Sequence, residues 1–163
     1  MFTQWCRPLP MAGLVFGLAL IVPGAGALAA GSATGHYVGN GRDAKLPNVS
    51  VIKNDGWEGR KGWTIIASEK PSGGSKKPDF DAQFGKLGDA LVLSVTEDGE
   101  LFSAQICHQA LKRSGFSSSG TIKVNGFSMK GGEVSAHFTT DGERSFFDDK
   151  WSVDLKINAP LPK

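Results

Sequence analysis

The sequence predicts an all-β fold, an antiparallel β-sandwich or flattened barrel of about eight strands with little helix. Apolar and polar residues alternate through Glu133–Thr140 and again through Trp151–Asn158. A period of two buries one face of a strand and hydrates the other, which is typical of antiparallel sheets. Glycine-containing turn pairs separate the β-rich stretches, and no long amphipathic helical repeat occurs.

The first 29 residues have the three parts of a secretory signal peptide. A short positive head, Met1–Arg7, precedes an uncharged apolar run, Pro8–Val22, and Pro23-Gly24 ends any helix. Ala27-Leu28-Ala29 then offers small residues to a signal peptidase, so we expect cleavage after Ala29. A transmembrane anchor is the alternative, but the apolar run is shorter than the roughly 20 residues that span a bilayer. We therefore expect a periplasmic or secreted protein with no transmembrane anchor after cleavage.

The rest of the chain is long enough for one domain. We expect a disordered lead over residues 30–35 and a single β domain over residues 36–163. Of the two cysteines, Cys6 leaves with the signal peptide, so Cys107 is the one thiol of the mature chain. The protein is then a monomer or a Cys107-linked dimer. A formal net charge of +2 gives no basis for nucleic-acid binding.

Eight segments rich in β-formers are expected to be strands. In chain order they are His36–Val38, Val49–Lys53, Trp63–Ser68, Ala90–Thr96, Leu101–His108, Thr121–Phe127, Glu133–Thr140 and Trp151–Asn158. The pair Asp98-Gly99 predicts a tight hairpin turn between two of them. Gly131-Gly132 and Asp141-Gly142 bracket the seventh strand in the same way.

Three loops are candidates for a binding surface: Lys53–Gly62, Lys70–Leu87 and Ser114–Gly120. The second, with two prolines and three glycines, is expected to be long and mobile. Loops on a rigid β scaffold often carry binding residues. The alternative is that a β protein merely tolerates insertions there.

Residues for catalysis or for a metal site are sparse. His36, His108 and His137 lie far apart, and no metal-ligand spacing joins them. Asp79 and Asp81 lack the further oxygen ligands of a calcium loop. We therefore expect no catalytic residue, no metal and no cofactor.

Cys107-His108 has the residue types of a nucleophile and its base. Adjacent side chains of a strand point to opposite faces, so these two are not expected to meet. If Phe102, Ala104 and Ile106 pack inward, Cys107 faces outward as a free thiol. If the strand has the opposite orientation, Cys107 points inward and is buried as a small apolar residue.

Binding residues are expected mainly in the loops. Trp57 lies in a turn-rich segment with Arg60 and Lys61, where an exposed indole can stack on a sugar or a peptide. Lys76-Lys77 and Phe116 are the candidates in the other two loops.

From about Gly35 to Leu161 the order of features resembles an uncharacterised family of small exported bacterial all-β proteins. The matching segments are Gly35-His36-Tyr37, Trp63–Pro71, the Asp98-Gly99 turn, Glu133–Thr140, Trp151–Leu155 and Ala159-Pro160-Leu161. Ala136 stands where the family pattern tends to have glycine. The resemblance implies export and an all-β fold, and it implies no functional residues, since the family has no assigned activity.

These observations favour a non-enzymatic binding or interaction module whose unknown partner is a protein or a surface. A hydrolase inhibitor is a special case of this hypothesis. The alternative is a small-ligand carrier with an apolar pocket between the sheets, which the sequence alone does not test. An enzyme is not expected, because convergent polar groups are not evident.

Overall fold

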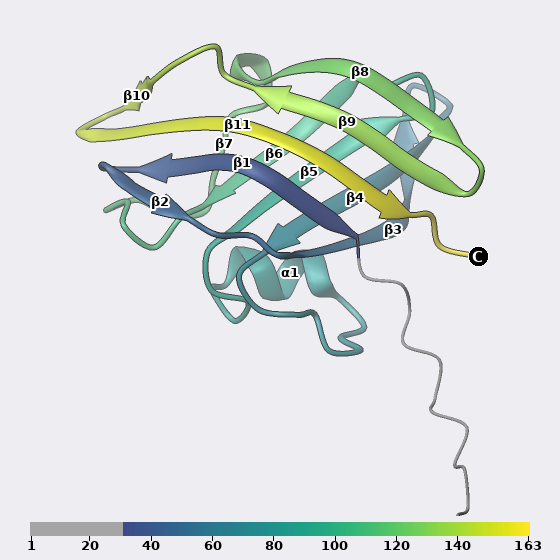
Figure 1. The fold of residues 1–163 in the computed structure, drawn as a ribbon, viewed down its shortest axis with the longest axis horizontal. Helices are drawn as coiled ribbons and strands as arrows, with labels where there is room; N and C mark the ends of the chain where they lie inside the picture. Colours follow the sequence, from purple (N-terminus) through teal and green to yellow (C-terminus); the bar gives the residue numbers. More distant parts are fainter. Residues whose placement is uncertain (1–30) are drawn as a thin grey trace, which may run out of the picture.

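The computed structural model describes residues 31–163, which form two antiparallel sheets packed face to face (Figure 1). The predicted signal peptide and Ala30 lie outside the described residues. The two sheets are separate, so the fold is a sandwich and not a closed barrel. The all-β prediction is confirmed.

Sheet A is a meander in which each strand pairs with its neighbour in the sequence. Its strands are β3 (Asn48–Trp57), β4 (Arg60–Ser68), β5 (Ala90–Thr96), β6 (Leu101–Cys107) and β7 (Phe116–Ser117). Antiparallel neighbours can be joined by short connections. Short turns join β3 to β4 and β5 to β6, whereas a longer segment joins β4 to β5.

Sheet B combines the two ends of the described chain, in the order β2-β1-β11-β9-β8, with β10 also paired to β11. Its strands are β1 (Ser32–Gly39), β2 (Arg42–Ala44), β8 (Lys123–Lys130), β9 (Glu133–Thr139), β10 (Arg144–Phe146) and β11 (Asp149–Pro160). The long central strand β11 pairs with β1 on one side and with β9 and β10 on the other. All eight predicted strands have counterparts, and the three short strands β2, β7 and β10 were not predicted.

The core fills the space between the sheets with alternate side chains of each strand. Sheet B contributes residues such as Phe138, Trp151 and Val153, and sheet A contributes residues such as Ile65 and Leu93, all buried. The alternation predicted for β9 and β11 is therefore confirmed, because their apolar set faces the core and their polar set faces solvent.

The expected disordered lead is wrong for residues 32–35, which form the first half of β1. The small residues here serve close packing. A Cβ on Gly31 would lie 2.4 Å from the Cβ of Ala159, and a Cβ on Gly35 would lie 2.0 Å from the carbonyl oxygen of Asp154. Glycine lets β1 approach β11 where a larger residue would clash.

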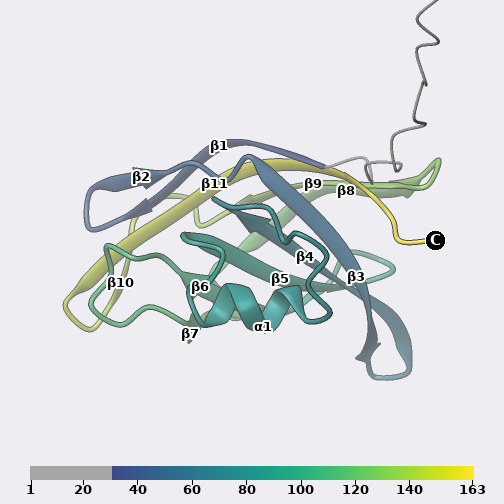
Figure 2. The same cartoon turned by 90° about the horizontal axis from the view of Figure 1, so that it is seen from below.

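The expected mobile loop Lys70–Leu87 instead contains a short helix, α1 (Pro78–Gln83), with a proline in its first turn. Proline is favoured there because its missing N–H has no intrahelical partner to lose. Figure 2 shows α1 against the outer face of sheet A, where Ala82 and Leu87 bury against Ile66 and Val92. No helix in residues 31–163 is long and apolar enough to cross a membrane.

Two buried aspartates fix the segment after β6. Asp149 accepts hydrogen bonds from the backbone N–H groups of Lys112 and Arg113, and from the side chain of Asn40. These bonds, first among them the one from Lys112, lower the pKa of the Asp149 carboxyl. Asp89 accepts from the Gln109 N–H, at 2.6 Å, and from Arg42, at 2.8 Å. This end of the sandwich is held by side-chain bonds to backbone, as buried polar groups require.

Candidate functional site

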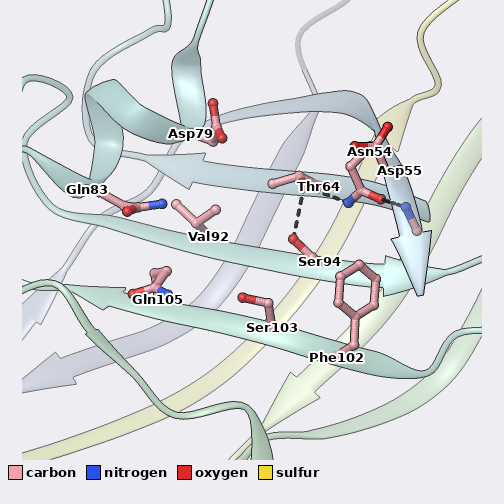
Figure 3. Close-up of a pocket in the computed structure, with 11 residues that line it drawn as sticks. Asn54, Asp55, Thr64, Asp79, Gln83, Val92, Ser94, Phe102, Ser103 and Gln105 are labelled. Carbon is pink, nitrogen blue, oxygen red and sulfur yellow. Dashed lines mark hydrogen bonds between the residues drawn. The ribbon is translucent and has the colours of Figure 1, made fainter. Parts of the chain in front are cut away.

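A groove of about 300 Å³ lies on the outer face of sheet A, beside α1 (Figure 3). Sheet B covers the inner face of sheet A, and α1 lies on part of the outer face. The lining residues come from β3–β6 and from α1: Asn54, Asp55, Gly56, Thr64, Asp79, Gln83, Val92, Ser94, Phe102, Ser103 and Gln105.

The floor of the groove is a row of hydroxyl groups across three strands. Thr64 of β4 pairs with Ser94 of β5, which pairs with Ser103 of β6. The Asn54 amide donates to the Thr64 hydroxyl at 2.9 Å, and the Thr64 and Ser94 hydroxyls lie 2.9 Å apart. The register of the sheet therefore places polar groups side by side on a surface that α1 leaves open.

Phe102 reaches the groove because of a β-bulge. Ser94 pairs with Ser103 but Val95 pairs with Leu101, so Phe102 is the extra residue of β6. The bulge turns Leu101 toward the core and Phe102 onto the outer face, where it lines the groove (Figure 3). Of the two alternatives left open by the sequence, Ala104 and Ile106 follow the one in which they pack inward, and Phe102 does not.

The β3–β4 hairpin closes one end of the groove. Its tip bends over the outer face so that the Trp57 ring stacks on Phe102, with ring centroids 6.0 Å apart and an interplanar angle of 15°. The bend depends on two glycines without side chains: a Cβ on Gly62 would lie 2.0 Å from the Asn54 Oδ1 atom and 2.6 Å from the Cα of Gly56. Trp57 remains 50% exposed, so part of its indole is free to contact a ligand.

The opposite wall is α1, which contributes Asp79 and Gln83. These residues are four apart and so lie on one side of the helix. Phe80 and Phe84, their sequence neighbours, pack against each other with ring centroids 4.3 Å apart and an interplanar angle of 35°, and they are 49% and 65% exposed. Exposed aromatic rings thus lie at the hairpin tip, where Trp57 is, and on α1.

Several polar side chains of the groove are free for a ligand. Figure 3 draws hydrogen bonds among Asn54, Gly56, Thr64 and Ser94 only. The groove residues that make no bond to one another in this view are Asp55, Asp79, Gln83, Ser103 and Gln105. The lining includes two carboxylates and no lysine or arginine. The arrangement suits a ligand that is neutral or cationic and that both donates and accepts hydrogen bonds.

Among the predicted binding residues, Trp57 does not line the groove but stacks on the lining residue Phe102. Arg60 and Lys61 lie farther along the same hairpin and do not line the groove either. Arg60 pairs with Asp98 at 3.1 Å and with Glu100 at 2.5 Å, and the bond to Glu100 raises the pKa of its guanidinium. It therefore joins the hairpin to the β5–β6 turn and is not free for a partner. Lys61 is exposed.

The other predicted binding residues lie apart from the groove lining. Lys76 and Lys77 are exposed just before α1. Phe116 is buried in the core, where it stacks on Phe146 at 4.0 Å and meets Trp151 edge-on at 5.6 Å. The prediction of Phe116 as a binding residue is wrong, because its ring is used in packing.

Cys107 faces outward from sheet A but is not exposed, since α1 and the segment after it cover the thiol. It is 2% exposed, and burial raises the pKa of the thiol to about 11. A thiol that is both protonated and covered does not readily form an intermolecular bond. The Cys107-linked dimer is therefore not supported.

His108 is buried on the other side of the strand, with its ring edge-on to Tyr37 at 4.9 Å. Its Nε2 lies 3.0 Å from the Arg42 carbonyl oxygen, and its Nδ1 accepts from the Ala110 N–H at 3.2 Å. Burial lowers its pKa, so the ring is a neutral structural group. Cys107 and His108 thus belong to different packing environments. No three His, Cys, Asp or Glu side chains in residues 31–163 are arranged to hold a metal ion.

Comparison with protein-family models, with curated proteins and with solved structures finds no match to this chain. The resemblance to the exported family therefore stays a prediction. The function is inferred from the residues of the groove.

Sequence reasoning found part of the groove and missed the rest. Two of the three predicted loops border it, through Asn54-Asp55-Gly56 and through Asp79 and Gln83, whereas Ser114–Gly120 contributes no lining residue. The polar positions of β5 and β6, Ser94 and Ser103, were the signal that was missed. They lie on the face that α1 leaves open, as does the polar Gln105 of β6.

Proposed function

We propose that this protein is an exported, non-enzymatic binding module and that the groove on the outer face of sheet A is its ligand site. The observation that carries the proposal is one hollow that combines free polar side chains with the Phe102 ring, on which the half-exposed Trp57 ring stacks. Small-ligand sites typically enclose about 300–1,000 Å³ and carry a few polar groups that fix orientation. The groove lies at the lower end of that range.

Binding without catalysis is supported by the composition of the lining. Its two carboxylates, Asp55 and Asp79, come from the hairpin and from α1, and Figure 3 places them apart. The lining includes no histidine, cysteine or lysine to act as a base or nucleophile beside them. Hydrogen bonding and stacking are the interactions that these residues offer.

The site lies outside the core, and this favours the groove over a pocket between the sheets. The space between the sheets is filled by large buried side chains, among them Trp151, Tyr37 and Phe138. A ligand on the open face needs no rearrangement of those side chains.

A nuclear magnetic resonance screen tests the proposal. The mature protein, labelled with ¹⁵N, is titrated with neutral oligosaccharides, short peptides and soluble lipid headgroups. We expect at least one class to shift the amide signals of Ser94, Ser103 and Gln105 together. Shifts confined to sheet B, or no shift from any class at about 10 mM, a concentration that detects even millimolar affinity, would contradict it.

A further inference from the structure

We infer that the ligand of the groove is a neutral oligosaccharide, with one sugar ring stacked on the exposed face of Trp57 beside Phe102. This inference rests on the proposed function, because it assigns a ligand class to the same groove. It draws on three independent features: the aromatic surface, the chemistry of the free polar groups and the charge of the lining.

The aromatic surface is flat, held in place and adjacent to polar groups. Trp57 is fixed by its stack on Phe102, which is itself fixed by the bulge in β6. An aromatic ring offers a large apolar face at low entropic cost, which suits the C–H face of a sugar ring. The 50% exposure of Trp57 leaves room for such a ring.

The polar groups match hydroxyl-rich ligands. A sugar hydroxyl both donates and accepts, and so do the Ser103 hydroxyl and the Gln83 and Gln105 amides. The carboxylates of Asp55 and Asp79 accept from two hydroxyls each. Within the groove these five side chains make no hydrogen bond to one another in Figure 3, so their bonding capacity is available.

The charge of the lining argues against anionic ligands. Its two carboxylates have no cation beside them in the lining, so nucleic acids, phosphorylated ligands and acidic sugars are repelled. A cationic peptide is the remaining competitor. The Ser103 hydroxyl and the Gln83 and Gln105 amides place donors and acceptors on one surface, which suits the hydroxyl groups of a sugar, and the cationic probe of the experiment below separates the two ligand classes.

The extent of the groove indicates the length of the ligand. Its lining runs from the β3–β4 hairpin, at Asn54 and Asp55, to α1, at Asp79 and Gln83, and so offers contacts to more than one sugar ring. We therefore expect affinity to rise from disaccharide to hexasaccharide.

Isothermal titration calorimetry on the mature protein tests the inference, with cellohexaose, laminarihexaose, maltohexaose, xylohexaose and chitohexaose as probes. Oligogalacturonate serves as the anionic comparison and a lysine hexapeptide as the cationic one. We expect at least one neutral hexasaccharide to bind and the anionic probe not to bind. Trp57→Ala should weaken that binding by about tenfold or more, whereas Trp57→Phe should retain part of it.

Phe147→Ala is the matched control, because Phe147 is 69% exposed and lies on the β10–β11 turn, where Arg113 covers its ring. It should leave the affinity unchanged. Binding that survives Trp57→Ala at full strength overturns the inference, since the sugar would then lie elsewhere.

The outcomes also separate this inference from the proposed function. If the lysine peptide shifts the groove amides and no neutral saccharide binds at about 10 mM, the sugar inference fails and the binding groove stands. If no probe reaches the groove, both fail. If a bound hexasaccharide is shortened on incubation, the protein is an enzyme and the non-enzymatic proposal fails.

Discussion

At the scale of single residues, the buried side chains show how closely the interior is packed. Gly39 of β1 lies against the His108 ring, and a Cβ at this position would lie 2.6 Å from the Nδ1 atom. The ring cannot move away without losing its bonds to the Arg42 carbonyl and the Ala110 N–H.

Gly39→Ala is therefore expected to lower the free energy of unfolding by about 1–3 kcal/mol, the usual cost of overpacking. Urea unfolding followed by circular dichroism measures the change. Gly120→Ala is the matched control, because no atom lies within 4 Å of a Cβ there. Equal stability of the two variants would mean that the His108 ring can move to make room for the new methyl group, which would contradict the close packing around it.

Cys107 gives a prediction for alkaline pH. Burial raises the pKa of its thiol from 9.0 to about 11, so the folded state holds the proton more tightly than the unfolded state. Stability from this group is complete below pH 9 and is lost as the pH rises toward 11, by about 2–3 kcal/mol in total. Urea unfolding at pH 8 and at pH 10.5 should show the loss, and Cys107→Ala should reduce it. An identical pH dependence in the variant would mean that other groups cause the loss.

At the scale of secondary-structure elements, the β3–β4 hairpin determines one end of the groove. Its tip bends where Gly56 and Gly62 approach each other, and the bend brings Trp57 onto Phe102. The turn itself has positive φ at Glu58 and Gly59, a type I′ pattern that fits the twist of a two-residue hairpin.

Gly62→Ala is expected to displace the hairpin tip, because the new Cβ would meet Asn54 and the backbone of Gly56. Loss of the Trp57–Phe102 stack should reduce the near-ultraviolet circular dichroism of the aromatic rings and weaken ligand binding by about tenfold. Unchanged aromatic dichroism with full affinity would contradict the role given to the bend.

Helix α1 is held on sheet A by a small contact surface that includes Ala82 and Leu87. Leu87→Ala removes much of that surface, so we expect α1 to open more often and expose Cys107. The rate of thiol modification by an aromatic disulfide reagent should rise about tenfold, which corresponds to a fall of about 1.4 kcal/mol in the free energy of opening α1. A thiol that stays as protected as in the unchanged protein would mean that the helix is not its cover.

At the scale of the whole molecule, sequence patterns predicted the sandwich better than they predicted the site. The period of two in Glu133–Thr140 and Trp151–Asn158 gave the phase of β9 and β11, because one face of each is core and the other is solvent. Long strands with this contrast determine their own register.

The features that sequence reasoning missed depend on contacts between distant segments. The strand character of Ser32–Gly35 comes from β11, and the burial of Phe116 comes from Phe146 and Trp151. The bulge that turns Phe102 outward is set by the pairing of β5 with β6, which no local pattern records. The loop residues that border the groove could therefore be predicted from the sequence, whereas the strand residues that form its floor could not.

The measurement that tests the central claim most directly compares two arginine substitutions on opposite faces of the sandwich. Ser103→Arg fills the floor of the groove, whereas Ser135→Arg places the same side chain on the outer face of sheet B. Affinity is measured by calorimetry for the oligosaccharide, peptide or headgroup that binds the unchanged protein most tightly. We predict that Ser103→Arg abolishes binding and that Ser135→Arg leaves it within about twofold. Full binding by Ser103→Arg, or its loss in Ser135→Arg alone, would show that the functional surface is not the groove.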